Sequence, residues 1–399
     1  MAGRSLLATS DPAFAQQVRG QSQAGCYSSK DRTNLEMAIV ALDLFCGCGG
    51  VTYGLARAGI KVALGIDIDE RCRFTFRLNN PGTNFLVADI RDVSAQTLLK
   101  HVPHLTESDF LLIAACAPCQ PFSSQNRSKN KTSGRAILNE VERIVRELRP
   151  EFLFLENVTG IQKVPGFSAF HRLLRALHNL KYKVEFRSID ALWYGIPQRR
   201  KRLVLLASVY GKIPWPEQTH GFGPGLQTPV TVREAIAHYP PLQAGEAHPT
   251  VPNHIAARLS PRNLERIRAT ACDGGSRSEW PRRLALSCHD THDGHEDVYG
   301  RLRWDALAPT LTTKCTSISN GRFGHPDQDR AISAREAAAL QGFDDRFVFY
   351  GGLRQISVQI GNSVPPVLAE RFGNAFKAEA EALNANKKRM KWALLLAGR

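Results

Sequence analysis

The feature that most constrains the fold is a series of short apolar runs, each of which ends in a polar residue or in glycine. The runs have the length of a strand, and segments with helical periodicity, such as 137–148, lie between several of them. The runs are 38–45, 61–66, 84–88, 109–116, 151–156 and 202–209. Apolar strands that alternate with helices predict an α/β fold with a doubly wound, mostly parallel, Rossmann-like sheet.

Chemically active residues stand where these runs end. The glycine-rich turn 46–50 follows the first run, and Asp67, Asp89, Cys119 and Glu156 lie at the ends of four others. Ligands of such sheets bind beyond the carboxyl ends of the strands. We therefore expect these residues to gather along one rim and to share one site.

The sequence predicts a large domain, a second and smaller domain, and an extension at each end. Alternation is strong up to about residue 211, then fades into a segment rich in arginine and resumes later. Within the resumed part, Ser333 and Glu336 predict a helix that opens with a capping box. The expected parts are a flexible N-terminal extension (1–36), the first part of the catalytic domain (37–211), the small domain (212–305), the completed catalytic domain (306–376) and a basic tail (377–399).

Composition limits the class of protein and its surroundings. The chain has 399 residues and a formal net charge of +15. Such a charge is typical of proteins that bind nucleic acid, although a basic enzyme with solvated arginines would also have it. No apolar run approaches the roughly 18 residues of a membrane span, and the N-terminus lacks a secretory signal. We therefore expect a cytoplasmic protein with no membrane partner and with its nine cysteines reduced.

The stretch "DLFCGCGGVTYGL" (43–55) indicates a nucleotide-like ligand. A glycine-rich turn that opens a helix presents backbone N–H groups to a ligand. Asp67 lies 20 positions after Gly47, which is the spacing of a carboxylate that binds ribose hydroxyls. A dinucleotide fingerprint would have glycine where Thr52 stands, which argues against a dehydrogenase. The turn also lacks a P-loop lysine, so an adenosine ligand without phosphates, such as S-adenosylmethionine, suits it better.

Two clusters of cysteine and histidine leave alternatives open. Cys116 and Cys119 form a C-x-x-C pair that could be redox-active or half of a zinc site, but the sequence has no second pair with this spacing. The stretch "CHDTHDGH" (288–295) could bind zinc, although a solvated histidine-rich loop is the better interpretation. We therefore predict no metal site.

Six motifs, taken in order, resemble those of the DNA cytosine-5 methyltransferases, and in particular the bacterial members that belong to restriction–modification systems. The motifs are "DLFCGCGG" (43–50), "APCQPFS" (117–123), "ENV" (156–158), "QRRKR" (198–202), "REAAALQGF" (335–343) and "QIGNSVPP" (359–366). The resemblance covers about residues 38–375. It implies a sheet of the S-adenosylmethionine-dependent methyltransferase type, with 212–305 as the target-recognition domain.

The resemblance also implies a catalytic set. A thiolate that adds to carbon 6 of cytosine turns the unreactive carbon 5 into an enamine-like carbon able to attack a sulfonium methyl. Cys119 is expected to be that thiolate, because the prolines on either side restrict where its sulfur points. Glu156 is expected to donate a proton to ring nitrogen 3 if burial keeps it protonated, the alternative being a structural pairing with an arginine. Asn157 would hold the loop beside Glu156. Arg202 would contact oxygen 2 of the base, and Arg200 would lie nearer the catalytic loop and backbone.

The cofactor implied is S-adenosylmethionine, with S-adenosylhomocysteine as the product. Phe45 would stack on adenine, Asp67 would bind the ribose and Asp89 the adenine amino group. In a compact fold the last segment can close back onto the first and complete the pocket. Two departures from the family are that Asp67 is shorter than the usual Glu and that "GFDD" (342–345) replaces Gly-Phe-Pro-Asp. The full cofactor set is Phe45, Gly47, Gly49, Asp67, Ile68, Asp89, Ile90, Pro118, Asn362 and Val364.

A base inside a duplex cannot reach a cysteine at the rim of the sheet, so we expect the target nucleotide of double-stranded DNA to rotate out of the helix. The polar loop 120–135 is expected to move and close over the DNA, and arginines of the small domain are expected to contact guanine edges or phosphates. The expected DNA-binding residues are Gln120, Ser123, Ser124, Arg258, Arg262, Arg282 and Arg283. We expect a monomer, with a cognate restriction endonuclease as its candidate partner.

Two other functions compete with this interpretation. A tRNA cytosine-5 methyltransferase would have a comparable length, but its Cys-Phe-Thr signature is missing from the recognition region. A catalytically silent DNA-binding relative would not need the Cys119, Glu156 and Arg202 set, which is intact here.

Overall fold

The computed structural model describes most of the chain beyond the N-terminal extension. The described residues are 38–103, 105–106, 108–117, 132–163, 169–286 and 297–397, with the backbone alone for 132–136, 162–163 and 387–397. Within these ranges no helix is long and apolar enough to cross a membrane.

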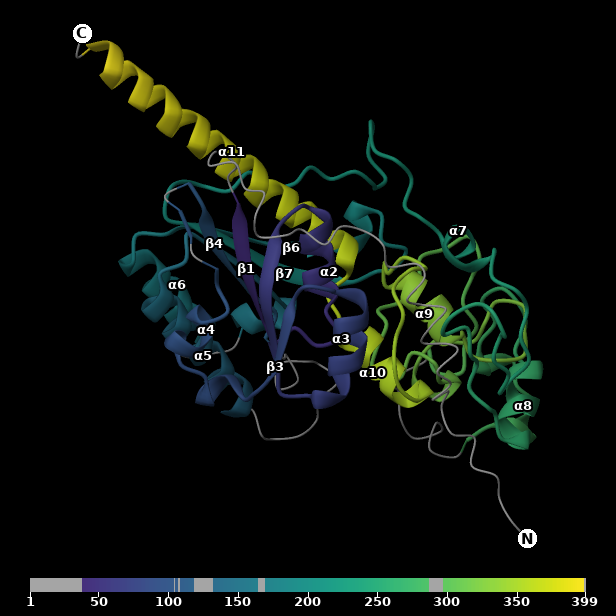
Figure 1. Cartoon of the computed structure of the whole chain (residues 1–399). Coiled ribbons are helices and arrows are strands. Elements are labelled where there is room, and N and C mark those ends of the chain that lie inside the picture. Colours follow the sequence, from purple (N-terminus) through teal and green to yellow (C-terminus); the bar gives the residue numbers. More distant parts are fainter. Residues whose placement is uncertain are drawn as a thin grey trace. The chain divides into compact units, whose positions relative to one another are not determined.

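Seven strands form one sheet in the order β3-β2-β1-β4-β5-β7-β6 (Figure 1). From β3 to β5 the neighbours pair in parallel, whereas β7 runs antiparallel to both β5 and β6. The mostly parallel α/β sheet that the sequence predicted is thus confirmed. The strands are β1 (Ile39–Leu44), β2 (Lys61–Asp67), β3 (Asn84–Val87), β4 (Phe110–Ala115), β5 (Phe152–Asn157), β6 (Lys183–Asp190) and β7 (Lys201–Ser208).

β6 is the strand that the apolar runs did not reveal. It lies at the edge of the sheet, and most of its residues are exposed or half-buried. An edge strand that faces solvent does not need a continuous apolar run. The sequence "KVEFRSID" therefore mixes charged and apolar residues and carries a weak signal.

Helices cover both faces of the sheet (Figure 1). Successive side chains of a strand point to opposite faces, and β5 shows how this divides the core. Leu153 joins the cluster that contains α5 and α6, whereas Phe152 and Phe154 pack against Phe376 and Phe372 of α11. The helices are α2 (Gly50–Arg57), α3 (Arg73–Asn79), α4 (Ala95–Leu99), α5 (Thr132–Leu148), α6 (Ala169–Asn179), α7 (Val232–Ile236), α8 (Pro261–Arg268), α9 (Ala334–Leu340), α10 (Leu353–Asn362) and α11 (Pro366–Ala397). The short 3-10 turns are η1 (Glu70–Cys72), η2 (Ile90–Asp92), η3 (Thr159–Lys163), η4 (Ala191–Tyr194), η5 (Arg277–Glu279), η6 (Arg282–Leu284) and η8 (Ile318–Asn320).

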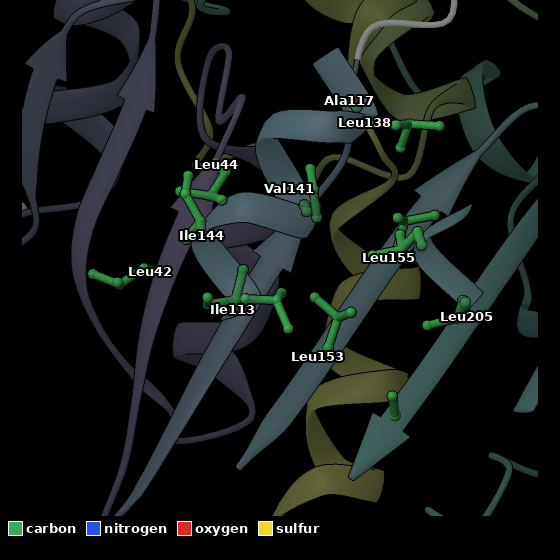
Figure 2. Close-up of a cluster of buried hydrophobic side chains, with 14 of the residues drawn as sticks. Leu42, Leu44, Ile113, Ala117, Leu138, Val141, Ile144, Leu153, Leu155 and Leu205 are labelled. Carbon is green, nitrogen blue, oxygen red and sulfur yellow. The ribbon is translucent and has the colours of Figure 1, made fainter. Parts of the chain in front are cut away.

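Figure 2 shows the core on the α5 face of the sheet. Leucines and isoleucines of the central strands meet Val141 and Ile144 of α5, and these side chains are almost fully buried. Burial of one such side chain contributes about 1.5–3 kcal/mol. This packing fixes the strands, and therefore the rim at which their carboxyl ends meet.

The last part of the chain closes back onto the first, as the sequence analysis expected. α11 packs along α2, and glycine at position 54 makes the approach close. A Cβ at Gly54 would collide with the Pro366 carbonyl and with Ala369. At Gly50 a Cβ would lie 2.7 Å from the carbonyl oxygen of Val364. Residues more than 300 positions apart thus share one side of the glycine-rich turn.

A second core joins the segment after β7 to the resumed catalytic part. Val232 and Ile236 of α7 belong to the same buried cluster as Leu311, Phe343 and Ile360. The domain boundaries at residues 211 and 305 stay predictions. The capping box at Ser333 and Glu336 is confirmed, and it opens α9.

Buried arginines hold together the part of the chain that has few helices and strands. Arg301 donates to the carbonyls of Ile267 (2.8 Å) and His325 (3.0 Å), and Arg330 binds both carboxylate oxygens of Glu336 (2.8 and 2.7 Å). Loop carbonyls have no partner in a helix or a sheet, so a buried guanidinium with several donors can satisfy them. The fully buried arginines are Arg301, Arg330 and Arg335.

We predict that Gly54→Val lowers the free energy of unfolding by about 1–3 kcal/mol, because the added side chain overpacks the contact between α2 and α11. Chemical denaturation followed by circular dichroism measures the effect. Gly223→Ala is the matched control, since its new Cβ would lie 3.6 Å from Leu226, an ordinary contact. Equal stability of the two variants would contradict the close packing of α11 on α2.

Candidate cofactor and catalytic site

The carboxyl ends of four neighbouring parallel strands, β2, β1, β4 and β5, lie at one edge of the sheet. This edge carries Asp67 at the end of β2, the glycine-rich turn after β1, Ala117 just beyond β4, and Glu156 with Asn157 at the end of β5. Ligand sites of doubly wound sheets form at such an edge. Five predicted site residues lie outside the described residues, namely Pro118, Cys119, Gln120, Ser123 and Ser124.

The glycine-rich turn requires glycine at two positions for different reasons. Gly47 (φ +52) and Gly49 (φ +92) both adopt left-handed backbone conformations that favour glycine. A side chain at Gly49 would also collide with Asn80 and Phe76. Beside Gly47, in contrast, no atom of the described residues other than its chain neighbours lies within 4 Å of the place where a Cβ would be. Gly49 therefore serves packing, and Gly47 leaves open space for a ligand.

Asp67 holds this turn in place. One carboxylate oxygen accepts the N–H of Gly47 and the other accepts the N–H of Asp69, each at 2.8 Å. Burial raises the pKa of the Asp67 carboxyl, and these backbone N–H groups oppose the rise. The spacing of 20 positions between Gly47 and Asp67 therefore has a structural reason, and ribose binding by Asp67 stays a prediction.

Residues around the turn fit an adenosine-type ligand. Phe45 is half-buried and Ile68 is 66% exposed, so two apolar side chains remain available at this edge to cover a flat ring. Asn362 is exposed at the end of α10, while Val364 is buried with its carbonyl against Gly50. The turn contains no lysine or arginine that would require a phosphate. Open space beside the turn, apolar flanks and nearby carboxylates are the features that S-adenosylmethionine requires.

Asp89 and Ile90 follow β3 at the same edge of the sheet. Asp89 accepts a hydrogen bond from Nε of Arg91 at 2.9 Å, and this hydrogen bonding lowers the pKa of its carboxyl. Ile90 is buried. An adenine amino group would thus find an ionised Asp89 that already has one partner, and the cofactor roles of both residues stay predictions.

The structure brings Glu156 and Arg202 together. Nε of Arg202 lies 3.0 Å from Oε1 of Glu156, and both side chains are largely buried. This Oε1 accepts no hydrogen bond from the described residues. A buried carboxylate with a free lone pair next to a guanidinium can bind a polar ring edge. A structural ion pair would show the same contact, so proton donation by Glu156 stays a prediction.

Asn157 links the end of β5 to the segment that leads to Cys119. Its side-chain amide donates to the carbonyl of Ala117 at 3.0 Å and its Oδ1 accepts the N–H of Val158 at 2.9 Å. The sequence analysis expected Asn157 to hold the loop beside Glu156. The hydrogen bond to Ala117 fixes the last described residue before that loop, and the role of Asn157 in holding the loop stays a prediction.

Arg200 is turned into the protein. It is 3% exposed, and its guanidinium donates to the carbonyls of Leu311 (3.3 Å), Gly361 (3.4 Å) and Ser363 (3.2 Å). These contacts hold the segment that carries Asn362 and Val364. In the described part of the chain Arg200 therefore supports the edge of the sheet that carries the glycine-rich turn, which we call the cofactor edge. A role of Arg200 nearer the catalytic loop stays a prediction.

Two buried residues of this region were missed by the sequence analysis. Gln198 is fully buried and joins the "QRRKR" segment to the "LQGF" segment through the Leu340 carbonyl (2.9 Å) and Gln341 (2.7 Å). Asp43 is also fully buried and accepts the hydroxyl of Thr52 at 2.7 Å. The sequence did contain a signal for Asp43. Thr52 stands where a dinucleotide fingerprint has glycine, and its hydroxyl donates to the Asp43 carboxylate.

The thiol of Cys116 does not favour redox or metal chemistry. Burial raises its pKa well above the ordinary value. The thiolate is the form that attacks disulfides and binds zinc, so a raised pKa opposes both. Elsewhere in the ranges that the structure covers, no group of histidine, cysteine and acidic side chains could hold a metal ion. The stretch 288–295 lies outside these ranges.

The arginines of the recognition region differ in their partners. Arg262 and Arg283 both approach Glu265, at 3.4 and 3.7 Å. Arg258 and Arg282 are exposed, and neither has an ion pair among the described residues. Arg266, from the same stretch, is buried against Trp280 and Tyr299. All four predicted arginines are exposed, and they divide into two without an ion pair among the described residues and two that share one carboxylate.

The fold and the residues at this edge fit an α/β enzyme that takes a nucleotide-like ligand beside its glycine-rich turn. A sequence profile of the C-5 cytosine-specific DNA methylases matches residues 39–378. The chain therefore belongs to the family of C-5 cytosine-specific DNA methylases, and it is an S-adenosylmethionine-dependent enzyme.

Individual proteins agree with this assignment. The chain is 36% identical to the Type II methylase M.HgiDII of Herpetosiphon aurantiacus, over 88% of this chain and 99% of that protein. It is 31% identical to the Type II methyltransferase M1.HphI of Haemophilus parahaemolyticus, over 85% and 87% of the two chains. A prophage-encoded DNA modification methyltransferase of E. coli shares the fold with a TM-score of 0.67 and 23% identity, over 86% of this chain and 99% of that chain.

We predict that Arg200→Gln lowers the free energy of unfolding by about 1–3 kcal/mol, because the carbonyls that the guanidinium satisfies lose their donor. Arg199→Gln is the control, since Arg199 is exposed next to it, and it should change stability by less than about 0.5 kcal/mol. Urea unfolding followed by tryptophan fluorescence compares the two variants. If Arg200→Gln were as stable as the wild type, these carbonyl contacts would have no structural role.

Proposed function

We propose that this enzyme methylates carbon 5 of a cytosine that has rotated out of a short, specific duplex sequence, by way of a transient bond between Cys119 and carbon 6. The observation that carries the proposal is the pair Glu156–Arg202 beside Asn157, whose amide binds the carbonyl two residues before Cys119. These contacts support a base-binding edge adjacent to the nucleophile. S-adenosylhomocysteine is the product.

The residues of this edge divide the work on the ring. The Cys119 thiolate forms the bond to carbon 6, and the electron pair of the 5,6 double bond moves toward carbon 5. Glu156 holds a proton at nitrogen 3, where negative charge would otherwise develop, and Arg202 donates to oxygen 2. Bound S-adenosylmethionine supplies the electrophilic methyl group. Loss of the proton from carbon 5 then returns an electron pair to the ring, and Cys119 leaves as a thiolate.

Rotation of the cytosine out of the duplex has a cost of a few kcal/mol, which contacts to the rest of the DNA must offset. Arg258 and Arg282 support this role because they are exposed cations without an acidic partner in the described part of the chain. Arg262 and Arg283 share Glu265, so their charge is partly neutralised before DNA arrives.

The likeness to Type II methylases supports a protective role beside a cognate restriction endonuclease. In that role the enzyme would methylate the site that the endonuclease cuts. We propose that the enzyme acts as a monomer, because methylation of one flipped base needs only one catalytic site, and all of its proposed residues come from one chain.

We predict that Cys119→Ala abolishes transfer of tritiated methyl groups to duplex DNA, because the ring no longer gains electron density at carbon 5. Cys272→Ala removes an exposed cysteine and should keep the wild-type rate. Glu156→Gln should slow transfer about 10²–10⁴-fold, the usual contribution of a general acid. Full activity of Cys119→Ala would remove the covalent step from the mechanism.

We predict that Arg282→Ala and Arg258→Ala each lower the affinity for the target duplex about tenfold and reduce the salt dependence of binding by about one charge. Fluorescence anisotropy at several salt concentrations measures both quantities. Lys183→Ala is the control, because it removes one exposed positive charge of β6, outside the recognition region. An effect of Lys183→Ala as large as that of the two arginine variants would show that only net charge matters.

A further inference from the structure

Asp43 lies beneath the glycine-rich turn and is not used by the mechanism above. It is the penultimate residue of β1 and is 0% exposed. Its Oδ2 accepts the hydroxyl of Thr52 at 2.7 Å, and its carboxylate also accepts the backbone N–H of Thr52. Gly49, which precedes α2, has no side chain to cap the helix. Asp43 therefore supplies from the neighbouring strand the cap that the turn itself lacks.

The surroundings of Asp43 are unusual for a buried carboxylate. Its Oδ1 has no hydrogen-bond partner within the described ranges. Among the described residues, the charged group that acts on it is another acid, Asp67, and the buried thiol of Cys46 and the half-buried thiol of Cys116 lie close enough to interact with its charge. Buried charges are normally paired, and the groups that surround this one from β2, β4 and the turn are acids and thiols.

We propose that Asp43 is a positioning residue of the cofactor site that also selects for charge: it holds the turn through Thr52, and its negative charge favours the cationic sulfonium donor over the neutral thioether product. The inference rests on the proposed function, because it assumes that S-adenosylmethionine binds at this turn. Donor and product have the same adenosine and amino-acid groups, so they differ at this site by one methyl group and one positive charge. A carboxylate in a medium of low dielectric distinguishes them without touching either.

The selection depends on pH with a definite sign. Burial raises the pKa of Asp43 to about 7. Above that pH the residue is ionised and favours the sulfonium, and below it the residue is neutral and the preference declines. Asp67 also faces this charge, and its own raised pKa adds to the trend, so the contribution of Asp43 must be separated by substitution.

The test is isothermal titration calorimetry of the full chain with S-adenosylmethionine and with S-adenosylhomocysteine, from pH 6 to pH 8.5. For the wild type we expect the ratio of the two affinities to shift toward the donor as pH rises. Asp43→Asn can still accept from Thr52 but has no charge. In this variant we expect the ratio at pH 8 to move toward the product by about fivefold, which corresponds to a unit charge acting over several ångströms across a partly hydrated site.

Thr52→Val is the matched variant, because it removes the hydroxyl but keeps the carboxyl of Asp43. It should weaken both ligands by a similar factor. Because the hydrogen bond from Thr52 lowers the pKa of Asp43, the shift of the ratio toward the donor should persist but occur at a higher pH. A ratio that is flat with pH in the wild type, or that is the same in Asp43→Asn, overturns the inference even if methylation is normal. If Asp43→Asn failed to fold, the smaller uncharged variant Asp43→Ser would take its place in the same titration. A chain that bound neither ligand would instead overturn the proposed function itself.

Discussion

The packing of α11 and the segment before it onto α2 is the constraint on which the site depends. All seven strands lie within residues 39–208, but the glycine-rich turn after β1 is completed by residues near the other end of the chain. The thiol of Cys48 in the turn lies 3.0 Å from the hydroxyl of Ser363, and the carbonyl of Val364 sits where a side chain at Gly50 would be. These contacts join residues more than 300 positions apart. Such non-local contacts are slow to form.

The large positive charge of the sequence overstates the charge available to DNA. Three arginines are fully buried, namely Arg301, Arg330 and Arg335. The guanidinium of Arg200 donates hydrogen bonds to carbonyls near the cofactor edge. Other arginines pair with nearby acids, as Arg262 does with Glu265. What remains for a phosphate backbone is a subset defined by exposure and by the lack of an acidic neighbour. The structure separates the two kinds of arginine, whereas a count of charges does not.

The fold followed from the sequence wherever burial imposed a pattern. The central strands are apolar because helices cover both of their faces. The start of α9 could be predicted from Ser333 and Glu336, which form its capping box. β6 was not predicted, because a strand at the edge of the sheet is partly exposed and does not need a continuous apolar run. At the site, residue identity pointed to Asp67 and Glu156, but periodicity cannot show hydrogen bonds. The bond from Gly47 to Asp67 and the inward turn of Arg200 depend on strands and loops that meet only in three dimensions.

Asp43 shows how a site residue can oppose stability. Its pKa in the folded chain is raised to about 7 by burial, so at lower pH the folded chain holds a proton that the unfolded chain has released. The free energy of unfolding therefore falls as the pH rises through 7, because ionisation of a buried carboxylate disfavours the folded state. An asparagine would accept the same hydroxyl of Thr52 without this cost. A charge that weakens the fold at a position where a neutral side chain would suffice is expected at a functional site, and the turn above it is the place where we propose that a cationic ligand binds.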